Sequence, residues 1–352
     1  MIKYIGSKRV LVPNLVELIA SLPGARTVVD LFSGTSRVGH ALKARGLQVH
    51  ANDHNAYAEV LARCYVQADG PELEADARRL LAHYQRLPGR AGYVTETFCE
   101  RSRFFQPHNG ERIDAIRDAI AGDGLPPELE AVVLTSLMEA ADRVDSTTGV
   151  QMAYLKQWAP RSYNQLELRL PQLLPRAAAG KGSAHGRDAV ELAGEIEADV
   201  AYLDPPYNAH KYLGNYHVWE TLVRWDRPEH YGAACKRVDC RARTSAFNSR
   251  PNAAAALQRL LSQLRTRWIV LSFNDEGFFT PDEITALLQP FGLCDVQTHD
   301  TKRYVGAQIG IYNPRGEKVG RVGRLRNVEF VFVLDRERAA CNRAVPFPSA
   351  PS

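Results

Sequence analysis

The chain of 352 residues lacks the long apolar segments of a membrane protein. No hydrophobic run is long enough to span a bilayer, and no stretch has the form of a signal peptide, so we expect a cytoplasmic protein with no membrane partner. The six cysteines are scattered, without a C-x-x-C pair or the second pair of cysteines or histidines that a zinc site needs. We therefore interpret the cysteines as free thiols and expect no metal.

The glycine patterns of two common nucleotide sites are also missing. The turn after the apolar strand predicted over 27–32 is neither G-x-G-x-x-G nor G-x-x-x-x-G-K-[ST], which disfavours a dinucleotide or ATP. What is present is a Gly34 turn followed by a predicted helix over 36–45, the usual corner for a nucleotide-containing ligand. A second predicted strand ends at Asp53, about twenty residues further on, where a carboxylate can accept both ribose hydroxyls. A helix cap is the alternative for Asp53.

The stretch Asp204-Pro205-Pro206-Tyr207 follows the apolar run 199–203, which predicts a buried strand. Two prolines end the strand and leave carbonyls without competing N–H groups. In an open α/β sheet ligands bind just beyond strand ends. A carboxylate, a proline carbonyl and a flat ring suit a planar base with an exocyclic amino group, because two acceptors can take its hydrogens while the ring stacks. The alternative is a plain turn that ends a strand.

Residues 65–182 differ from the rest because no strand of the main sheet is evident there. Helices are predicted over 72–87, 111–121 and 127–143, which indicates a mostly helical insertion. Its polar side chains could read base edges in nucleic acid or could simply be solvated. The candidates for nucleic-acid contact are Arg101, Arg103, Asn109, Arg143 and Arg161.

Two later segments are rich in positive charge. Residues 224–250 carry seven Lys or Arg against three Asp or Glu, and residues 299–326 carry seven against two. Such turn-rich basic segments suit phosphate contacts, although solvated loops often look the same. The net charge of +4 is compatible with a polyanionic partner. The candidates for phosphate contact are Lys236, Arg237, Arg241, Arg243, Lys302, Arg303, Arg315 and Lys318.

The other predicted elements complete an α/β pattern. Helices are predicted over 13–21 and 281–289, and strands over 267–274, 293–298 and 327–334. The spacing of Trp219, Leu222 and Val223 predicts a helix face packed on the sheet. A short strand ending at Asp188 could bind an adenine amino group. His217 is interpreted as structural rather than as a general base.

Four motifs in this order resemble those of bacterial N6-adenine DNA methyltransferases, the Dam-like DNA adenine methylase family. The motifs are Tyr4-Ile5-Gly6-Ser7-Lys8, Asp30-Leu31-Phe32-Ser33-Gly34, Asn52-Asp53 and Asp204-Pro205-Pro206-Tyr207. The resemblance implies an α/β fold, the Rossmann-like fold of S-adenosylmethionine-dependent methyltransferases with a mostly parallel seven-stranded sheet. It further implies a catalytic domain over 1–66 and 183–335, a helical target-recognition insertion over 67–182 and a flexible tail over 336–352.

The resemblance also implies a reaction and its residues. S-adenosylmethionine would be held by Tyr4, Lys8, Asp30, Phe32, Gly34, Asp53, Asp188 and Asp204. The catalytic set would be Asp204, Pro205, Pro206 and Tyr207, acting on an adenine flipped out of double-stranded DNA.

The expected partners are double-stranded DNA and, in a restriction-modification system, a cognate endonuclease, with the protein a monomer or weak dimer. Three alternatives stay open: another acceptor, such as N4 of cytosine, an RNA base or a protein amide; an inactive DNA-binding relative; and a Rossmann-type oxidoreductase.

Overall fold

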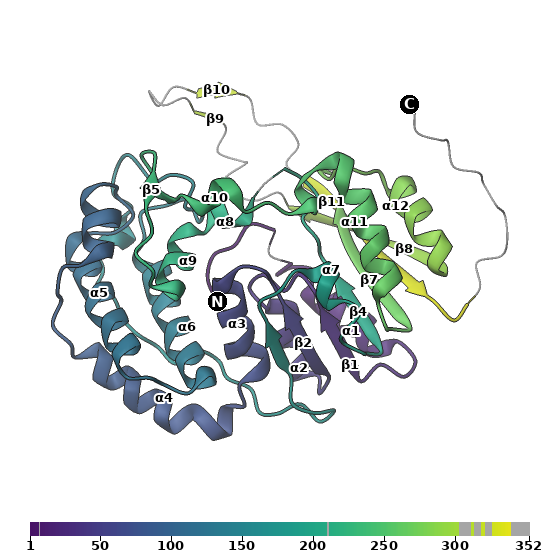
Figure 1. Cartoon of the computed structure of the whole chain (residues 1–352), viewed down its shortest axis with the longest axis horizontal. Helices are drawn as coiled ribbons and strands as arrows, with labels where there is room; N and C mark the ends of the chain where they lie inside the picture. Colours follow the sequence, from purple (N-terminus) through teal and green to yellow (C-terminus); the bar gives the residue numbers. More distant parts are fainter. Residues whose placement is uncertain (7, 210, 303–310, 313–317, 321–325, 339–352) are drawn as a thin grey trace.

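A seven-stranded sheet forms the centre of the computed structural model, which describes residues 1–338 except 7, 210, 303–310, 313–317 and 321–325 (Figure 1). The strands follow the spatial order β3-β2-β1-β4-β7-β11-β8. In chain order they are β1 (Thr27–Asp30), β2 (Gln48–Asn52), β3 (Ser183–His185), β4 (Val200–Leu203), β7 (Trp268–Asn274), β8 (Leu293–Lys302) and β11 (Arg326–Asp335). The predicted tail beyond residue 338 lies outside the described residues.

Most neighbouring strands run parallel. β1 pairs in parallel with β2 and β4, β2 with β3, and β4 with β7. β11 lies between β7 and β8 and runs antiparallel to both. The sheet therefore confirms the expected Rossmann-like α/β class.

Helices cover both faces of this sheet, because alternate strand residues point to opposite sides. Val28 and Val200 face α1 (Val12–Ser21) and α2 (Arg37–Ala44) in one apolar cluster. Val29 and Ala201 face the opposite cluster. That second cluster is completed by α7 (Ala189–Leu192), α11 (Arg250–Gln263) and α12 (Pro281–Leu288). The sequence patterns did not predict α11.

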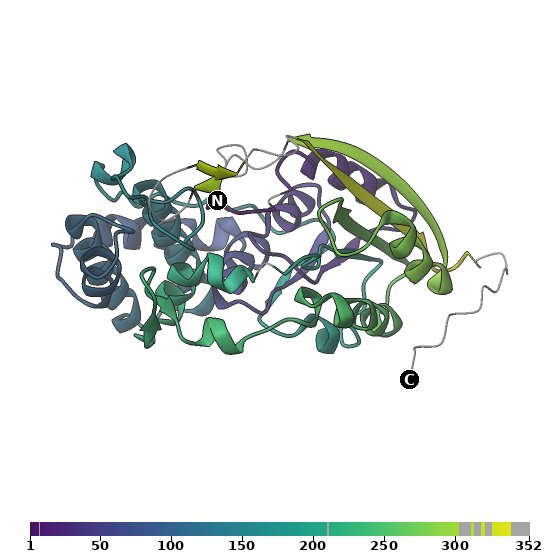
Figure 2. The same ribbon diagram turned by 90° about the horizontal axis from the view of Figure 1, so that it is seen from above.

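A second body of helices lies to one side of the sheet, as Figures 1 and 2 show. It contains the three helices predicted in the insertion, with bounds close to those expected. They are α4 (Gly70–Gln85), α5 (Pro107–Gly122) and α6 (Pro127–Val144). Between α4 and α5 lies the π-helical segment η2 (Thr95–Glu100). These helices share one apolar cluster with α3 (Ala56–Ala62), which follows β2.

Helix α9 (His217–Arg224) belongs to this helical body rather than to the sheet. Its Trp219 and Leu222 are buried in the same cluster as α4 and α6. The predicted helix is therefore correct, but its expected packing against the sheet is wrong, because apolar spacing defines a face and not the partner of that face. The helical core thus draws on two separated parts of the chain.

The remaining elements are short. They are η1 (Arg63–Gln67), η3 (Pro160–Tyr163), α8 (Tyr212–Asn215), β5 (His230–Tyr231), β6 (Lys236–Arg237), α10 (Asp239–Ala242), η4 (Ala246–Asn248), η5 (Gln289–Phe291), β9 (Ile311–Tyr312) and β10 (Lys318–Gly320). Among the described helices, none combines the length and apolarity needed to cross a membrane.

Replacing the α9 anchor should destabilise the protein. Trp219 is 1% exposed, so Trp219→Ala should lower the free energy of unfolding by about 3–5 kcal/mol through lost burial and a cavity. Chemical denaturation followed by circular dichroism measures this. The matched control is Trp158→Ala, because the ring of Trp158 is only partly buried and contacts the Arg103 guanidinium. A loss of less than about 1 kcal/mol for Trp219→Ala would contradict the packing described.

Candidate active site

The four sequence motifs meet at the edge of the sheet where β1, β2 and β4 end. A cleft opens there, and about 700 Å³ of empty space lies in it and in its opening to solvent. Seven of the eight residues predicted to hold the cofactor line it: Tyr4, Lys8, Asp30, Phe32, Gly34, Asp53 and Asp204. The eighth, Asp188, lies outside this lining. It is exposed and caps α7, where its carboxylate accepts hydrogen bonds from the backbone N–H groups of Val190 and Glu191.

The turn after β1 is built around Gly34. Its φ of +50° favours glycine, and a Cβ there would lie 3.3 Å from the Tyr4 ring. The Gly34 N–H donates to Asp53 Oδ2 at 3.1 Å, while Asp53 Oδ1 accepts from the Asn55 backbone N–H at 2.9 Å. One carboxylate thus fixes two turns and still lines the cleft.

The N-terminal segment reaches over this turn through a stack of aromatic rings. The Tyr4 ring stacks with Tyr216 and with Tyr212, at 4.5 Å and 5.4 Å between ring centres, and the planes are nearly parallel in both pairs. Its hydroxyl pairs with that of Tyr57 at 3.2 Å. A Cβ on Gly6 would approach the Tyr212 hydroxyl to 3.0 Å, so this crossing also depends on glycine. The segment therefore forms one wall of the cleft.

Several polar atoms in the cleft lining are buried without a hydrogen-bond partner among the described residues. They are Asp30 Oδ1, Ser33 Oγ, Asn55 Oδ1 and Arg37 Nε. Burial also raises the pKa of Asp30. Unpartnered buried polar groups are costly, so a cleft that gathers acceptors and a guanidinium donor is suited to a polar ligand. A zwitterionic ligand with ribose hydroxyls matches this set of donors and acceptors.

Asp204 stands at the end of β4 with its side chain 19% exposed. Its Oδ1 accepts from Ser272 Oγ at 2.9 Å and lies 3.2 Å from Lys8 Nζ. Burial raises the pKa of this carboxyl, and the Lys8 ammonium and the Ser272 hydroxyl oppose that shift. Lys8 also contacts Glu329 at 2.8 Å.

Tyr207 is less accessible than the predicted stacking role requires. It is 8% exposed, packs on Phe273 at 5.2 Å between ring centres, and its hydroxyl accepts from Asn274 Nδ2 at 2.8 Å. Lys8 Nζ lies over its ring, 5.6 Å from the centre. Pro206 lines the main cleft and also, with Pro205 and Tyr207, a second, small apolar cavity. Stacking of a base on Tyr207 therefore requires the Lys8 ammonium to shift.

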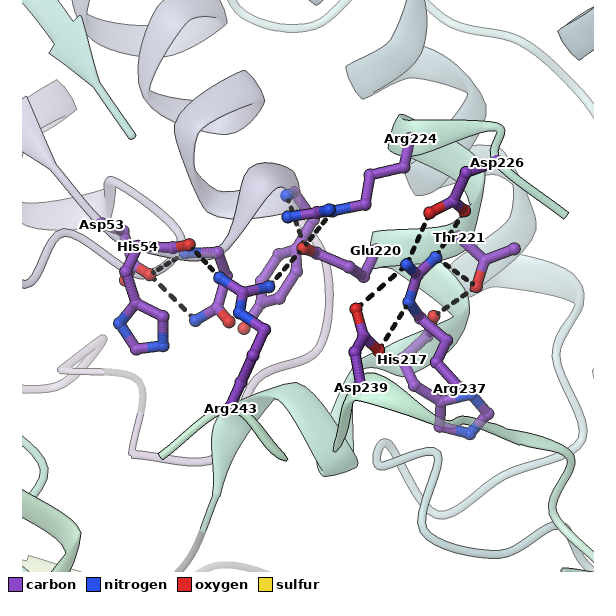
Figure 3. Close-up of polar contacts among 12 residues, drawn as sticks. Asp53, His54, His217, Glu220, Thr221, Arg224, Asp226, Arg237, Asp239 and Arg243 are labelled. Atoms are coloured by element: carbon purple, nitrogen blue, oxygen red, sulfur yellow. Dashed lines mark hydrogen bonds and ion pairs between the residues drawn. The ribbon is translucent and has the colours of Figure 1, made fainter. Parts of the chain in front are cut away.

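A buried carboxylate, Glu220 of α9, links this site to the segment that follows α10 (Figure 3). It accepts from Arg224 at 2.8 Å, from Arg243 at 2.9 Å and from the Tyr57 backbone N–H at 3.2 Å. Arg243 also donates to the His54 carbonyl. Arg243, which was predicted as a phosphate contact, therefore stabilises the turn that carries Asp53.

Two predicted nucleic-acid contacts lie in the interior, and we do not retain them. Asn109 is buried, with its amide donating to the Ser162 and Asn164 carbonyls. Arg237 is buried and bonds the carboxylates of Asp226 and Asp239 (Figure 3). Both residues were predicted from their polar side chains alone, but whether a polar side chain is exposed or bonded inside the protein depends on tertiary packing.

The other candidates are at least partly exposed or lie outside the described side chains. Arg143 donates to a backbone carbonyl and Arg161 pairs with Asp145. Arg101, Arg103, Lys236 and Arg241 keep part of their surface accessible. Lys302 ends β8 and Lys318 begins β10, whereas Arg303 and Arg315 fall outside the described residues.

Sequence reasoning missed further residues of the site. Arg37, Asn55 and Ser245 line the cleft, and Ser272, Asn274 and Glu329 contact the motif residues from β7 and β11. His217 was interpreted correctly as structural: it is buried, its Nε2 lies 2.9 Å from the Gln151 carbonyl, and burial lowers its pKa to about 3.

The sheet order and the motifs at its edge define a methyltransferase of the Rossmann-like class. The family model of the D12 class N6 adenine-specific DNA methyltransferases matches residues 4–272, and the chain belongs to this family.

Three curated relatives agree with that assignment. The Type II methyltransferase M.NlaIII of Neisseria lactamica is 30% identical over 313 residues, which cover 86% of this chain and 92% of that protein. The modification methylase StsI of Streptococcus sanguinis is 29% identical, covering 87% and 49%, and the Type II methyltransferase M.FokI of Planomicrobium okeanokoites is 30% identical, covering 83% and 47%. This chain therefore spans about half the length of the last two.

Loss of the Ser272 hydroxyl should change the titration of Asp204. The hydrogen bond from Ser272 favours the ionised carboxylate, so Ser272→Ala should raise the pKa of Asp204 further. Carboxyl ¹³C NMR of aspartate-labelled protein, followed against pH, measures the shift. The control is Ser262→Ala, since Ser262 is exposed and its hydroxyl donates to the Arg259 carbonyl of its own helix. An unchanged or lower pKa of Asp204 would contradict a stabilising hydrogen bond from Ser272 to the ionised carboxylate.

Proposed function

We propose that this chain transfers a methyl group from S-adenosylmethionine to N6 of an adenine in double-stranded DNA, at a specific sequence. The observation that carries the proposal is the position of Asp204. Its carboxylate, held by Lys8 and Ser272, opens onto the same cleft as the Gly34 turn and Asp53. A methyl donor and an amino acceptor can thus meet in one cleft.

The cleft residues suit this cofactor, which when bound supplies an electrophilic methyl group on a sulfonium. Asp53 is suited to the ribose hydroxyls, as its place after β2 predicts. Asp30 offers a buried acceptor for the amino group of the methionine part, and Arg37 offers a cation for its carboxylate. The rings of Tyr4 and Phe32 supply the apolar walls.

The protein must first take the target adenine out of the duplex, because its N6 is inaccessible within the base stack. Asp204 and the Pro205 carbonyl then accept the two N6 hydrogens. This orients the amino group, withdraws its lone pair from conjugation with the ring, and aims it at the methyl carbon. Methyl transfer would form the N6–methyl bond as the sulfur–methyl bond breaks, and the cationic nitrogen would then release one proton to solvent water. Orientation and charge placement supply most of the rate.

Partly exposed basic side chains would bind the DNA. Phosphate contacts from the partly exposed Arg101, Arg103, Lys236 and Arg241 would place the duplex without specifying its sequence. Because the relatives are named as type II and modification methylases, we include a cognate restriction endonuclease as a partner of this chain.

Methylated nucleosides test the function directly. Purified protein incubated with unmethylated bacterial genomic DNA and S-adenosylmethionine should yield N6-methyldeoxyadenosine after digestion, measured by mass spectrometry. Sequencing the same DNA gives the recognised site. N4-methyldeoxycytidine would keep the fold and overturn the choice of base. No methylated nucleoside, with cofactor binding intact, would favour a silent DNA-binding relative.

Removing the Asp204 carboxylate should separate catalysis from cofactor binding. Asp204→Ala should abolish methyl transfer, because N6 loses its charged acceptor, while S-adenosylmethionine affinity stays within about tenfold. Radiolabelled methyl transfer and isothermal titration calorimetry measure the two quantities. Asp295→Ala, an exposed change on β8, is the control. Retained turnover in Asp204→Ala would overturn the catalytic assignment.

A further inference from the structure

Glu329 contacts the active site although it belongs to none of the four motifs. It lies near the start of β11, with its side chain 13% exposed, and its Oε2 is 2.8 Å from Lys8 Nζ. Its register partner on β7 is Asn274, the residue that donates to the Tyr207 hydroxyl. The end of β7 and the start of β11 therefore contact the motif residues Lys8 and Tyr207 and hold them in place.

The charges at this point do not balance. The Lys8 ammonium, 5% exposed, lies between the carboxylates of Glu329 and Asp204. Among the described residues, the titratable groups that interact with Asp204 also include Asp30 and three tyrosines, Tyr202, Tyr207 and Tyr212. One buried cation thus serves two carboxylates, and a site with this excess of negative charge can accept a second positive charge.

The proposed reaction brings such a charge. The N6 amino group needs Asp204 as an acceptor and becomes cationic as the methyl group arrives. An ammonium that stays on Asp204 Oδ1 would compete with N6 for the negative charge of this carboxylate and would repel the developing charge. Lys8 therefore has to leave Asp204, and Glu329 is already within bonding distance.

We propose that Glu329 is a positioning residue that draws Lys8 away from Asp204 when the target amino group binds. Lys8 then stays beside the site, paired with Glu329, and Asp204 is free for N6. The same shift uncovers the face of Tyr207, over which the ammonium now lies. This inference rests on the proposed function, because it assigns a role within that reaction. A purely structural contact between the N-terminal segment and β11 is the alternative.

The first test is Glu329→Gln. Single-turnover methyl transfer should slow by about 10- to 100-fold, because Lys8 would stay on Asp204, while cofactor and DNA affinities change less than about threefold. The matched control is Glu74→Gln, which removes the same charge from an exposed pair on α4. An unchanged transfer rate in Glu329→Gln would overturn the proposal.

The pH profile separates positioning from a structural role. The Glu329 charge raises the pKa of Asp204, so its removal should lower that pKa. Because Asp204 must be ionised, the acid limb of the transfer rate should move to lower pH in Glu329→Gln, even though the plateau falls. Lys8→Met should move the limb to higher pH. A purely structural contact predicts lower stability with an unchanged plateau rate, because the Coulombic effect of Glu329 on Asp204 does not depend on a movement of Lys8.

A double-mutant cycle tests whether Glu329 acts through Lys8. In a Lys8→Met background, Glu329→Gln should change the transfer rate on the pH plateau, where Asp204 is fully ionised, by less than about twofold, since the cation it attracts is gone. Effects that multiply independently would overturn the proposal.

A measurement of the pKa of Lys8, which needs no methyl transfer, tests the inference about Glu329 separately from the proposed function. In ¹³C-lysine-labelled protein, Glu329→Gln should lower the pKa of Lys8, because one of its two carboxylate partners is lost. Glu74→Gln should leave it unchanged. If the wild-type protein is inactive but the pKa of Lys8 shifts, the proposed function is overturned, and with it the catalytic role of Glu329. If the wild-type protein is active but the pKa of Lys8 does not shift, only the inference about Glu329 is overturned.

Discussion

The Lys8 ammonium holds together segments that are far apart in the sequence. It contacts Asp204 at 3.2 Å and Glu329 at 2.8 Å and lies over the ring of Tyr207. A buried cation is tolerated only when it is paired, and buried carboxylates need the same compensation. The N-terminal segment, the end of β4 and the start of β11 therefore depend on one another, and the cleft exists because they meet.

The sequence predicts much of this fold because several buried strands are short apolar runs followed by glycine or proline, which indicate where each strand ends. Thr27–Asp30 and Val200–Leu203 are followed by a glycine turn and by two prolines, which mark both the strand end and the site. The three-residue strand Ser183–His185 has no comparable signal. The expected strand ending at Asp188 is therefore misplaced, and Asp188 caps a helix instead.

The supporting residues of the site could not be predicted in the same way. Ser272 and Asn274 are two polar residues in the otherwise apolar strand β7, and Glu329 is one of several polar residues of β11. Their partners follow from sheet register and tertiary packing rather than from local pattern. The basic residues show the converse problem. Arg237 and Arg243 fall in a segment with the composition of a phosphate-binding loop, yet both bond carboxylates of the protein itself. Composition gives the number of charges but not the partners that neutralise them.

The antiparallel direction of β11 has a chemical consequence. Parallel strands bring their carboxyl ends to the ligand edge, so β1, β2 and β4 contribute residues that follow the strand. β11 runs the opposite way, so its amino-terminal half reaches that edge, where Glu329 faces Asn274 at the end of β7. A residue inside a strand is held by ladder hydrogen bonds on both sides and is more rigid than one in a turn. The carboxylate that competes with Asp204 for Lys8 is thus fixed to the sheet, whereas the Lys8 ammonium stands at the end of a flexible four-carbon side chain and is the partner that can move.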